Sequence, residues 1–150
     1  MRWIICLIAS VSPVSAATAD TGDKALSCIG KEIRLGADGY NRDYRAIFII
    51  NDNAQSWKKY SQESGASSSV CDGLPSCAVE YGSVGMVMKS SESGTRIDAK
   101  LDREDGRFTW FERREGRISS IYSSDIPLVS KIATCSLTEL PAQSNKTMKF

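Results

Sequence analysis

Residues 96–110 read RIDAKLDREDGRFTW, and this stretch decides the fold. Its first seven residues alternate between apolar and charged side chains, which is typical of a β-strand with one buried and one solvated face. Asp105-Gly106 is a turn signal, so the chain should reverse there and place Leu101 opposite Phe108. The stretch therefore predicts an antiparallel hairpin with one apolar face.

The same register pairs Ala99 with Trp110, so a small residue faces a large one within the core layer. On the solvated face it brings Asp102 to Arg107, as an exposed ion pair that contributes under about 1 kcal/mol. A second reversal after the hairpin predicts a third strand over residues 118–122, beside the second strand.

Strand composition recurs elsewhere, between regularly spaced turn signals, over residues 27–35, 45–51, 84–89 and 130–137. The polar, serine-rich segment 54–69 is interpreted as a short helical turn or a loop. The pattern predicts an all-β fold: a single antiparallel meander of about seven or eight short strands. The meander is expected to form a closed or partly closed barrel, or alternatively a sandwich.

The chain is expected to be exported. A single arginine, an apolar stretch and then small residues make residues 1–19 a signal peptide, cleaved after Ala16 or Ala19. Residues 20–140 should form one β domain and residues 141–150 a disordered tail. We expect a periplasmic or secreted bacterial protein whose mature form does not insert into a membrane.

Four cysteines remain once a leader carrying Cys6 is removed: Cys28, Cys71, Cys77 and Cys135. An even number in an oxidising compartment favours two disulfides, for which the sequence permits three connectivities. Cys71 and Cys77 bracket a loop that can turn back, which leaves Cys28 to join the first strand to the last through Cys135. The spacings are too wide for the usual four-cysteine zinc site, so no metal is expected.

The chain contains no histidine, which removes the commonest general base near neutral pH and the usual catalytic triads. The carboxylates at positions 98, 102, 104, 105 and 112 fit the surface of a hairpin, although a pair of them remains an alternative acid–base site. Without Arg2 the chain holds 18 Lys plus Arg and 18 Asp plus Glu, a balance that does not favour nucleic acid. We therefore expect a non-enzymatic protein without a cofactor.

Phe111 is an aromatic side chain on the charged face of the hairpin, opposite Asp98. An apolar group among charges indicates a partner surface or the second layer of a closed barrel. Phe108 and Trp110, on the other face, are expected to pack in the core.

Residues 101–108, LDREDGRF, resemble a hairpin written roughly Ile-Asp-Arg-x-Thr-Gly-x-Phe in small exported proteobacterial proteins. Those proteins also carry one cysteine in the first strand, like Cys28, and one after the last hairpin, like Cys135. Leu101 and Asp105 depart from the pattern. The resemblance implies an architecture and a compartment, and no activity.

Residues 91–97, SESGTRI, are similar to the Ser-Gly-Ser-Gly-Ala-Arg-Tyr segment of periplasmic inhibitors of C-type lysozyme, which are small β-barrels. In that family a loop serine enters the lysozyme cleft, which would place Ser91 or Ser93 at the contact. The chain departs from the family at Ile97, which replaces tyrosine, and in lacking a Trp-x-Lys-Gly motif, whose lysine Arg113 or Arg114 would have to replace.

The leading hypothesis is an exported binding or inhibitor-type protein whose partner is an unknown macromolecule, such as a lysozyme or another envelope protein. Its candidate contact residues are Ser91, Ser93, Arg96, Phe111 and Arg113. The alternatives are a small carboxylate-dependent cell-wall hydrolase and a lipocalin-like carrier, which requires an internal cavity.

Overall fold

The computed structural model describes residues 22–92, 94–114 and 127–141, which form a single all-β sheet of nine strands. The strands are β1 (Asp23–Arg34), β2 (Tyr40–Asn51), β3 (Ser56–Ser61), β4 (Ala66–Ser69), β5 (Ala78–Tyr81), β6 (Gly85–Glu92), β7 (Thr95–Asp102), β8 (Arg107–Arg114) and β9 (Val129–Thr138). Within these ranges no helix is long and apolar enough to cross a bilayer.

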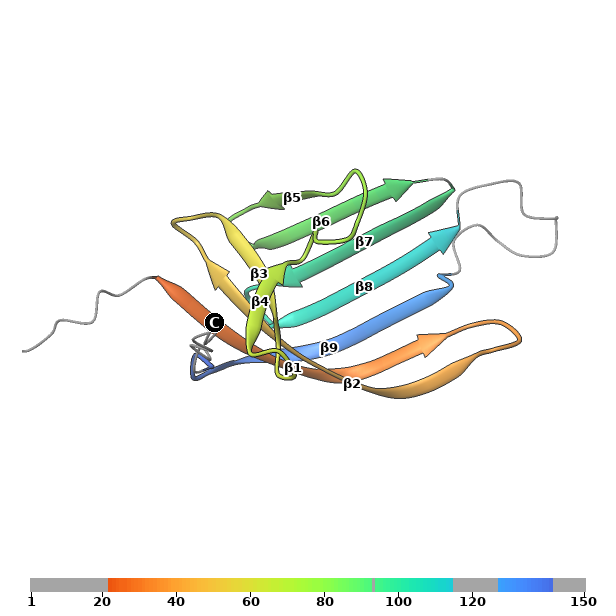
Figure 1. The fold of residues 1–150 in the computed structure, drawn as a ribbon, viewed down its shortest axis with the longest axis horizontal. Helices are drawn as coiled ribbons and strands as arrows, with labels where there is room; N and C mark the ends of the chain where they lie inside the picture. Colours follow the sequence, from red (N-terminus) through yellow and green to blue (C-terminus); the bar gives the residue numbers. More distant parts are fainter. Residues whose placement is uncertain (1–21, 93, 115–126, 142–150) are drawn as a thin grey trace, which may run out of the picture.

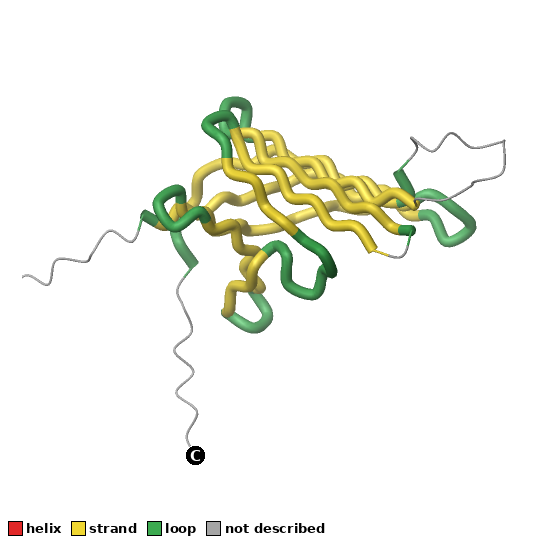
Figure 2. Tube along the Cα trace, turned by 90° about the horizontal axis from the view of Figure 1, so that it is seen from above, coloured by secondary structure: helices red, strands yellow, loops and turns green. Residues whose placement is uncertain are grey.

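The sheet is a meander curled into a half-barrel, with the strand order β4-β3-β2-β1-β9-β8-β7-β6-β5. Every neighbouring pair is antiparallel, and β9 returns to pair with β1, so the two halves of the chain meet at the middle of the sheet. Figure 1 shows β6 to β9 side by side, and Figure 2 shows the sheet bending round an interior. The prediction of a partly closed antiparallel barrel is confirmed, with one or two more strands than expected.

The two edges of the half-barrel, β4 and β5, are consecutive in the sequence and are joined by residues 70–77. This connection contains the Cys71–Cys77 disulfide. It is fixed to β6 by the Ser90 hydroxyl, which donates a 2.6 Å hydrogen bond to the carbonyl oxygen of Pro75. A cross-linked loop therefore joins the two edges that do not hydrogen-bond to each other.

The hairpin that residues 96–110 predict is β7–β8. Its register pairs Leu101 with Phe108 and Ala99 with Trp110, as expected. Asp102, however, forms its ion pair with Lys100 of its own strand, at 2.9 Å, and not with Arg107. Residues two apart on a strand share a face, and a long lysine side chain can bridge that distance.

Two strand assignments need correction. The expected third strand, 118–122, lies outside the described residues, and β8 pairs with β9 instead: Phe108 lies opposite Ala133 and Trp110 opposite Lys131. The segment 54–69, interpreted as a helical turn or loop, is the β3–β4 hairpin. Its serines and lysines are compatible with an edge hairpin because most of its side chains are exposed.

The core lies on the concave face. Residues 47–50 are largely buried, and Phe48 contributes to the core cluster together with Phe108 and Leu101. Cys28 lies directly opposite Cys135 in the β1–β9 register, with their Cα atoms 4.0 Å apart, and the two form the second disulfide. Both predicted disulfides are thus present, and this one joins the first strand to the last.

Candidate functional site

The concave face carries an open cavity of about 210 Å³, here called the interior cavity. Side chains from β2, β3, β4, β6, β7, β8 and β9 line it, together with residues of the 70–77 connection. Its volume is below the roughly 300–1,000 Å³ that is typical of sites for drug-sized molecules. The half-barrel thus offers an open space suited to a small ligand.

Aromatic side chains form much of the wall. Phe108 lies at the centre, with its ring 5.0 Å from Phe48, 5.8 Å from Tyr44 and 6.3 Å from Trp57 between centroids. Residue alternation explains this gathering, since Tyr44 and Phe48 are an even number of positions apart on β2 and so face the same side. Burial raises the pKa of Tyr44 far above its usual value, so this residue is neutral.

Lys131 brings a positive charge to this aromatic wall. Its Nζ lies 4.9 Å from the ring centroid of Trp110 and 5.6 Å from that of Tyr44. Burial lowers the pKa of Lys131, and attraction to Glu32 offsets this only in part. Lys131 forms no ion pair within 4.0 Å among the described residues.

Three more polar groups line the interior cavity from β3, β4 and the connection. Lys59 and Ser68 lie opposite each other on β3 and β4 and are both exposed at its rim. The Asp72 carboxylate, also at the rim, accepts a 3.0 Å hydrogen bond from the Ser69 backbone N–H. Trp57 is only 2% exposed, and its Nε1–H has no acceptor in the described part of the chain.

A buried carboxylate lies next to the interior cavity. Glu32 of β1 is opposite Lys131, but its oxygens accept a 2.6 Å hydrogen bond from the Tyr40 hydroxyl and bonds of 3.1 and 3.2 Å from Arg42. Burial alone would raise the pKa of Glu32, but the hydrogen bonds from Tyr40 and Arg42 outweigh it and hold that pKa below its usual value. The Glu32 carboxylate therefore already has two partners other than Lys131: Tyr40 donates a hydrogen bond, and Arg42 supplies the opposite charge.

Four of the five predicted partner contacts gather on the outer face of β6–β8. Ser91, Arg96 and Arg113 form one row across the three strands, and Phe111 lies opposite Asp98 in the next row. Ser93 lies outside the described residues. Sequence reasoning therefore grouped residues that do lie together, on a surface separate from the interior cavity.

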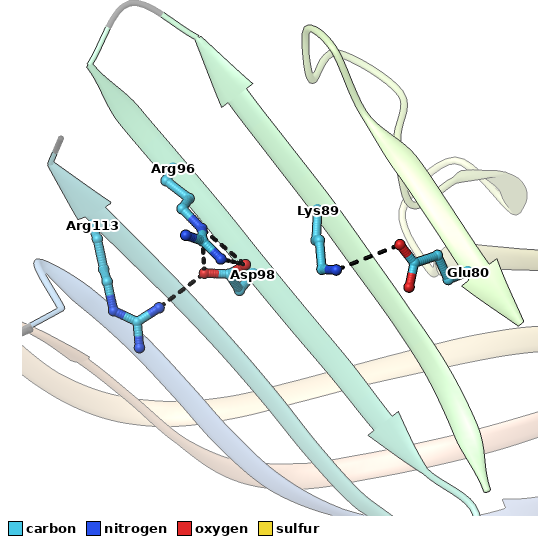
Figure 3. A network of polar contacts seen from close by, with 5 residues as sticks. All are labelled: Glu80, Lys89, Arg96, Asp98 and Arg113. Carbon is cyan, nitrogen blue, oxygen red and sulfur yellow. Dashed lines mark hydrogen bonds and ion pairs between the residues drawn. The ribbon is translucent and has the colours of Figure 1, made fainter. Parts of the chain in front are cut away.

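Ion pairs hold this outer surface together. Asp98 binds Arg96 and Arg113, each at 3.0 Å, as Figure 3 shows. The guanidinium of Arg113 also lies 5.1 Å from the ring centroid of Phe111. The charged groups of this patch thus largely satisfy one another, which leaves no concentrated charge of either sign.

Two of the carboxylates suggested for acid–base chemistry, Asp98 and Asp102, are bound to cations. Asp98 is held by its two arginines, and the hydrogen bonds from Lys100 and from the Glu104 backbone keep the pKa of Asp102 low. A general acid requires a raised pKa. No group of three or more Cys, Asp or Glu side chains able to hold a metal ion occurs among the residues that the structure describes.

Sequence reasoning missed the residues of the interior cavity. Trp57 lay in the segment interpreted as a loop, so its orientation was not considered. Lys131 carried a usable signal, because it is an even number of positions from Cys135, a predicted disulfide cysteine that is buried in the structure. A lysine in phase with a buried cysteine indicates an inward-facing charge.

Comparisons with protein-family models, with curated proteins and with solved structures find no match to this chain. Its function must therefore be inferred from its own geometry.

Proposed function

We propose that this chain is an exported, non-enzymatic binding protein that holds a small ligand in the interior cavity of its half-barrel. The observation that carries the proposal is the aromatic wall of the cavity around Phe108, with polar groups at Lys131 and at the rim. Cavities with mostly apolar walls and a few placed polar groups are the usual form of a small-molecule site. Of the functions considered from the sequence, this is closest to the lipocalin-like carrier.

The proposal is testable by tryptophan fluorescence, because Trp57 and Trp110 line the cavity and Trp3 is the only other tryptophan of the chain. In a chain carrying Trp3→Phe, titration with phenylbutanol, a neutral ligand of suitable size, should change the emission in a saturable way at millimolar concentration.

A matched pair of variants locates the binding. Ser68→Phe places a large side chain at the cavity wall, whereas the same change at Ser67, the preceding residue of β4, points to the other face. We expect Ser68→Phe to weaken phenylbutanol binding about tenfold, which corresponds to ~1.4 kcal/mol, and Ser67→Phe to leave it unchanged. Equal effects of the two variants, or no saturable signal, would contradict the proposal.

A second candidate function is binding of a macromolecule through the outer face of β6–β8. The row of Ser91, Arg96 and Arg113 supports it, because residues selected from the sequence lie side by side in the fold. Its sharpest version is inhibition of a C-type lysozyme. Purified protein at micromolar concentration should then slow lysozyme turnover, and Arg96→Ala should relieve the inhibition; unchanged turnover excludes that version.

The hydrolase alternative has less support, because Asp98 and Asp102 are each paired with a cation. Zymography on peptidoglycan tests it directly. A hydrolase would clear the gel and lose activity with Asp98→Asn or Glu112→Gln, whereas a binding protein would leave the gel intact.

A further inference from the structure

The interior cavity has a polar end and an apolar floor, which constrains what it binds. Lys131 lies against Trp110 and Tyr44; Tyr44 stacks on Phe108, which in turn contacts Phe48. A charge thus stands at one end of a continuous aromatic surface. A ligand that matches this surface has an apolar body and one polar group.

The sign of the charge at the polar end follows from the side chains that face it. Lys131 and Lys59 both line the cavity, and neither forms an ion pair within the described ranges. The nearest carboxylate across the strand pair, Glu32, is bound by Tyr40 and Arg42. Within the described residues the cavity therefore presents a half-buried cation with no carboxylate in direct contact, since Glu32 acts on it only at longer range.

One carboxylate does line the cavity, and its position matters. Asp72 is exposed at the rim, where it accepts the backbone N–H of Ser69. Lys131, by contrast, is half-buried between two rings. An ion pair is stronger where water is excluded, so the inner lysine dominates the recognition of an ionic group.

Resting on the function proposed above, we propose that the ligand is a small amphipathic organic acid, whose carboxylate pairs with Lys131 and whose apolar body lies against Phe108 and Phe48. A neutral or cationic molecule of the same shape would make the aromatic contacts but would lack the ion pair.

The test compares two probes of the same shape and different charge. Phenylbutyrate and phenylbutanol share the ring and the alkyl chain, and only the first carries a carboxylate. In the chain carrying Trp3→Phe, we expect phenylbutyrate to bind about tenfold tighter than phenylbutanol, the difference typical of one charge-assisted hydrogen bond. Phenylbutylamine should bind more weakly than either.

Variants of Lys131 assign the preference to one side chain. Lys131→Met keeps the length of the side chain and removes the charge, so it should lower phenylbutyrate affinity about tenfold while phenylbutanol affinity stays within about twofold. Lys131→Arg should retain the preference for phenylbutyrate. Lys58→Met, at an exposed position of β3 that does not line the cavity, should change neither affinity.

The outcomes separate this inference from the function on which it rests. If phenylbutanol binds and responds to Ser68→Phe, but phenylbutyrate binds no tighter or Lys131→Met has no effect on it, the cavity is a ligand site and the organic-acid class is wrong. If neither probe binds, the proposed function itself fails. Binding of phenylbutanol to the Lys131→Met protein also establishes that this variant is folded.

Discussion

At the scale of single residues, Glu32 and Lys131 carry opposite charges on neighbouring strands but have different bonding partners. They lie opposite each other on β1 and β9, yet Glu32 has Tyr40 and Arg42 as hydrogen-bond partners, while the described close contacts of the Lys131 ammonium are the rings of Trp110 and Tyr44. A carboxylate with strong donors is stable when buried. A lysine ammonium is stabilised less by aromatic rings than a carboxylate is by strong hydrogen-bond donors. Lys131 can therefore still bind an external anion.

The arrangement around Glu32 predicts acid-sensitive stability. Because the pKa of Glu32 is lower in the folded than in the unfolded protein, its contribution is fully present above its ordinary pKa of 4.5 and is lost as the pH falls below that value. Glu32→Gln should cost about 1–2 kcal/mol at pH 7, the usual range for a hydrogen bond to a charged group with a largely exposed partner. Urea denaturation at several pH values measures both.

A control for this prediction lies on the opposite face of β1 and β2, the strands that carry Glu32 and its two hydrogen-bond partners. Asp43 pairs with Lys31 at 2.7 Å, but both side chains are more than 60% exposed. Asp43→Asn should therefore change the free energy of unfolding by less than about 1 kcal/mol. If Glu32→Gln proved equally mild, or if its stability fell on acidification as steeply as that of the wild type, the account given for Glu32 would be wrong.

At the scale of elements, the β7–β8 turn depends on Gly106. Its φ of +68° favours glycine, and a Cβ at this position would lie 2.4 Å from the carbonyl oxygen of Cys135. Gly106 also accepts the Cys135 backbone N–H at 2.7 Å, so the turn fixes β9 against the hairpin. Substitution should strain both the turn and the strand beside it.

Gly73 provides a matched comparison, because its φ is +76° but a Cβ there would meet nothing within 4 Å. Gly73→Ala should cost about 1–2 kcal/mol, the usual cost of a left-handed residue with a side chain. Gly106→Ala should cost clearly more, since it adds a steric clash. Thermal or urea unfolding of the two variants measures both losses of stability. Equal losses would show that β9 can move away from residue 106 without an energetic cost.

The strands were predictable where alternation was strong and turns carried glycine. Residues 96–110 predicted both strands of their hairpin and its register, because one apolar face and a tight turn leave little choice. The β3–β4 hairpin was missed, since an exposed edge strand rich in serine lacks an alternating apolar pattern. The neighbour of β8 was also missed, because strand order depends on contacts that are distant in sequence.

The two candidate sites differ in how well the sequence predicted them. The row on the outer face of β6–β8 was predicted from local motifs, because Arg96 and Arg113 belong to adjacent strands of one hairpin that the sequence predicts. The interior cavity was not found, since Trp57, Phe108 and Lys131 meet only when β3, β8 and β9 curl toward one another. Such a site depends on the curvature of the sheet, which no local pattern encodes.

At the scale of the whole molecule, the two disulfides have different tasks. Cys28–Cys135 joins residues 107 positions apart and lies in the middle of the sheet, whereas Cys71–Cys77 closes a loop of 6 positions across the open side. The first links the two halves of the chain, each of which forms a separate part of the meander. The second shapes the connection that lines the interior cavity through Val70 and Leu74.

Removing each disulfide should therefore affect a different property. In the chain-entropy model, Cys28→Ala with Cys135→Ala lowers the free energy of unfolding by about 5 kcal/mol, and Cys71→Ala with Cys77→Ala lowers it by about 2 kcal/mol. Where both double variants are folded, we expect the Cys71/Cys77 variant to lose more phenylbutanol binding than the Cys28/Cys135 variant. Of the two disulfides, only Cys71–Cys77 lies in a segment that lines the cavity, the 70–77 connection. Urea denaturation and fluorescence titration on the two double variants measure these effects. A larger loss of stability in the Cys71/Cys77 variant would mean that the 70–77 connection contributes more to holding the fold than the long disulfide does. A larger loss of phenylbutanol binding in the Cys28/Cys135 variant would mean that this connection does not shape the cavity.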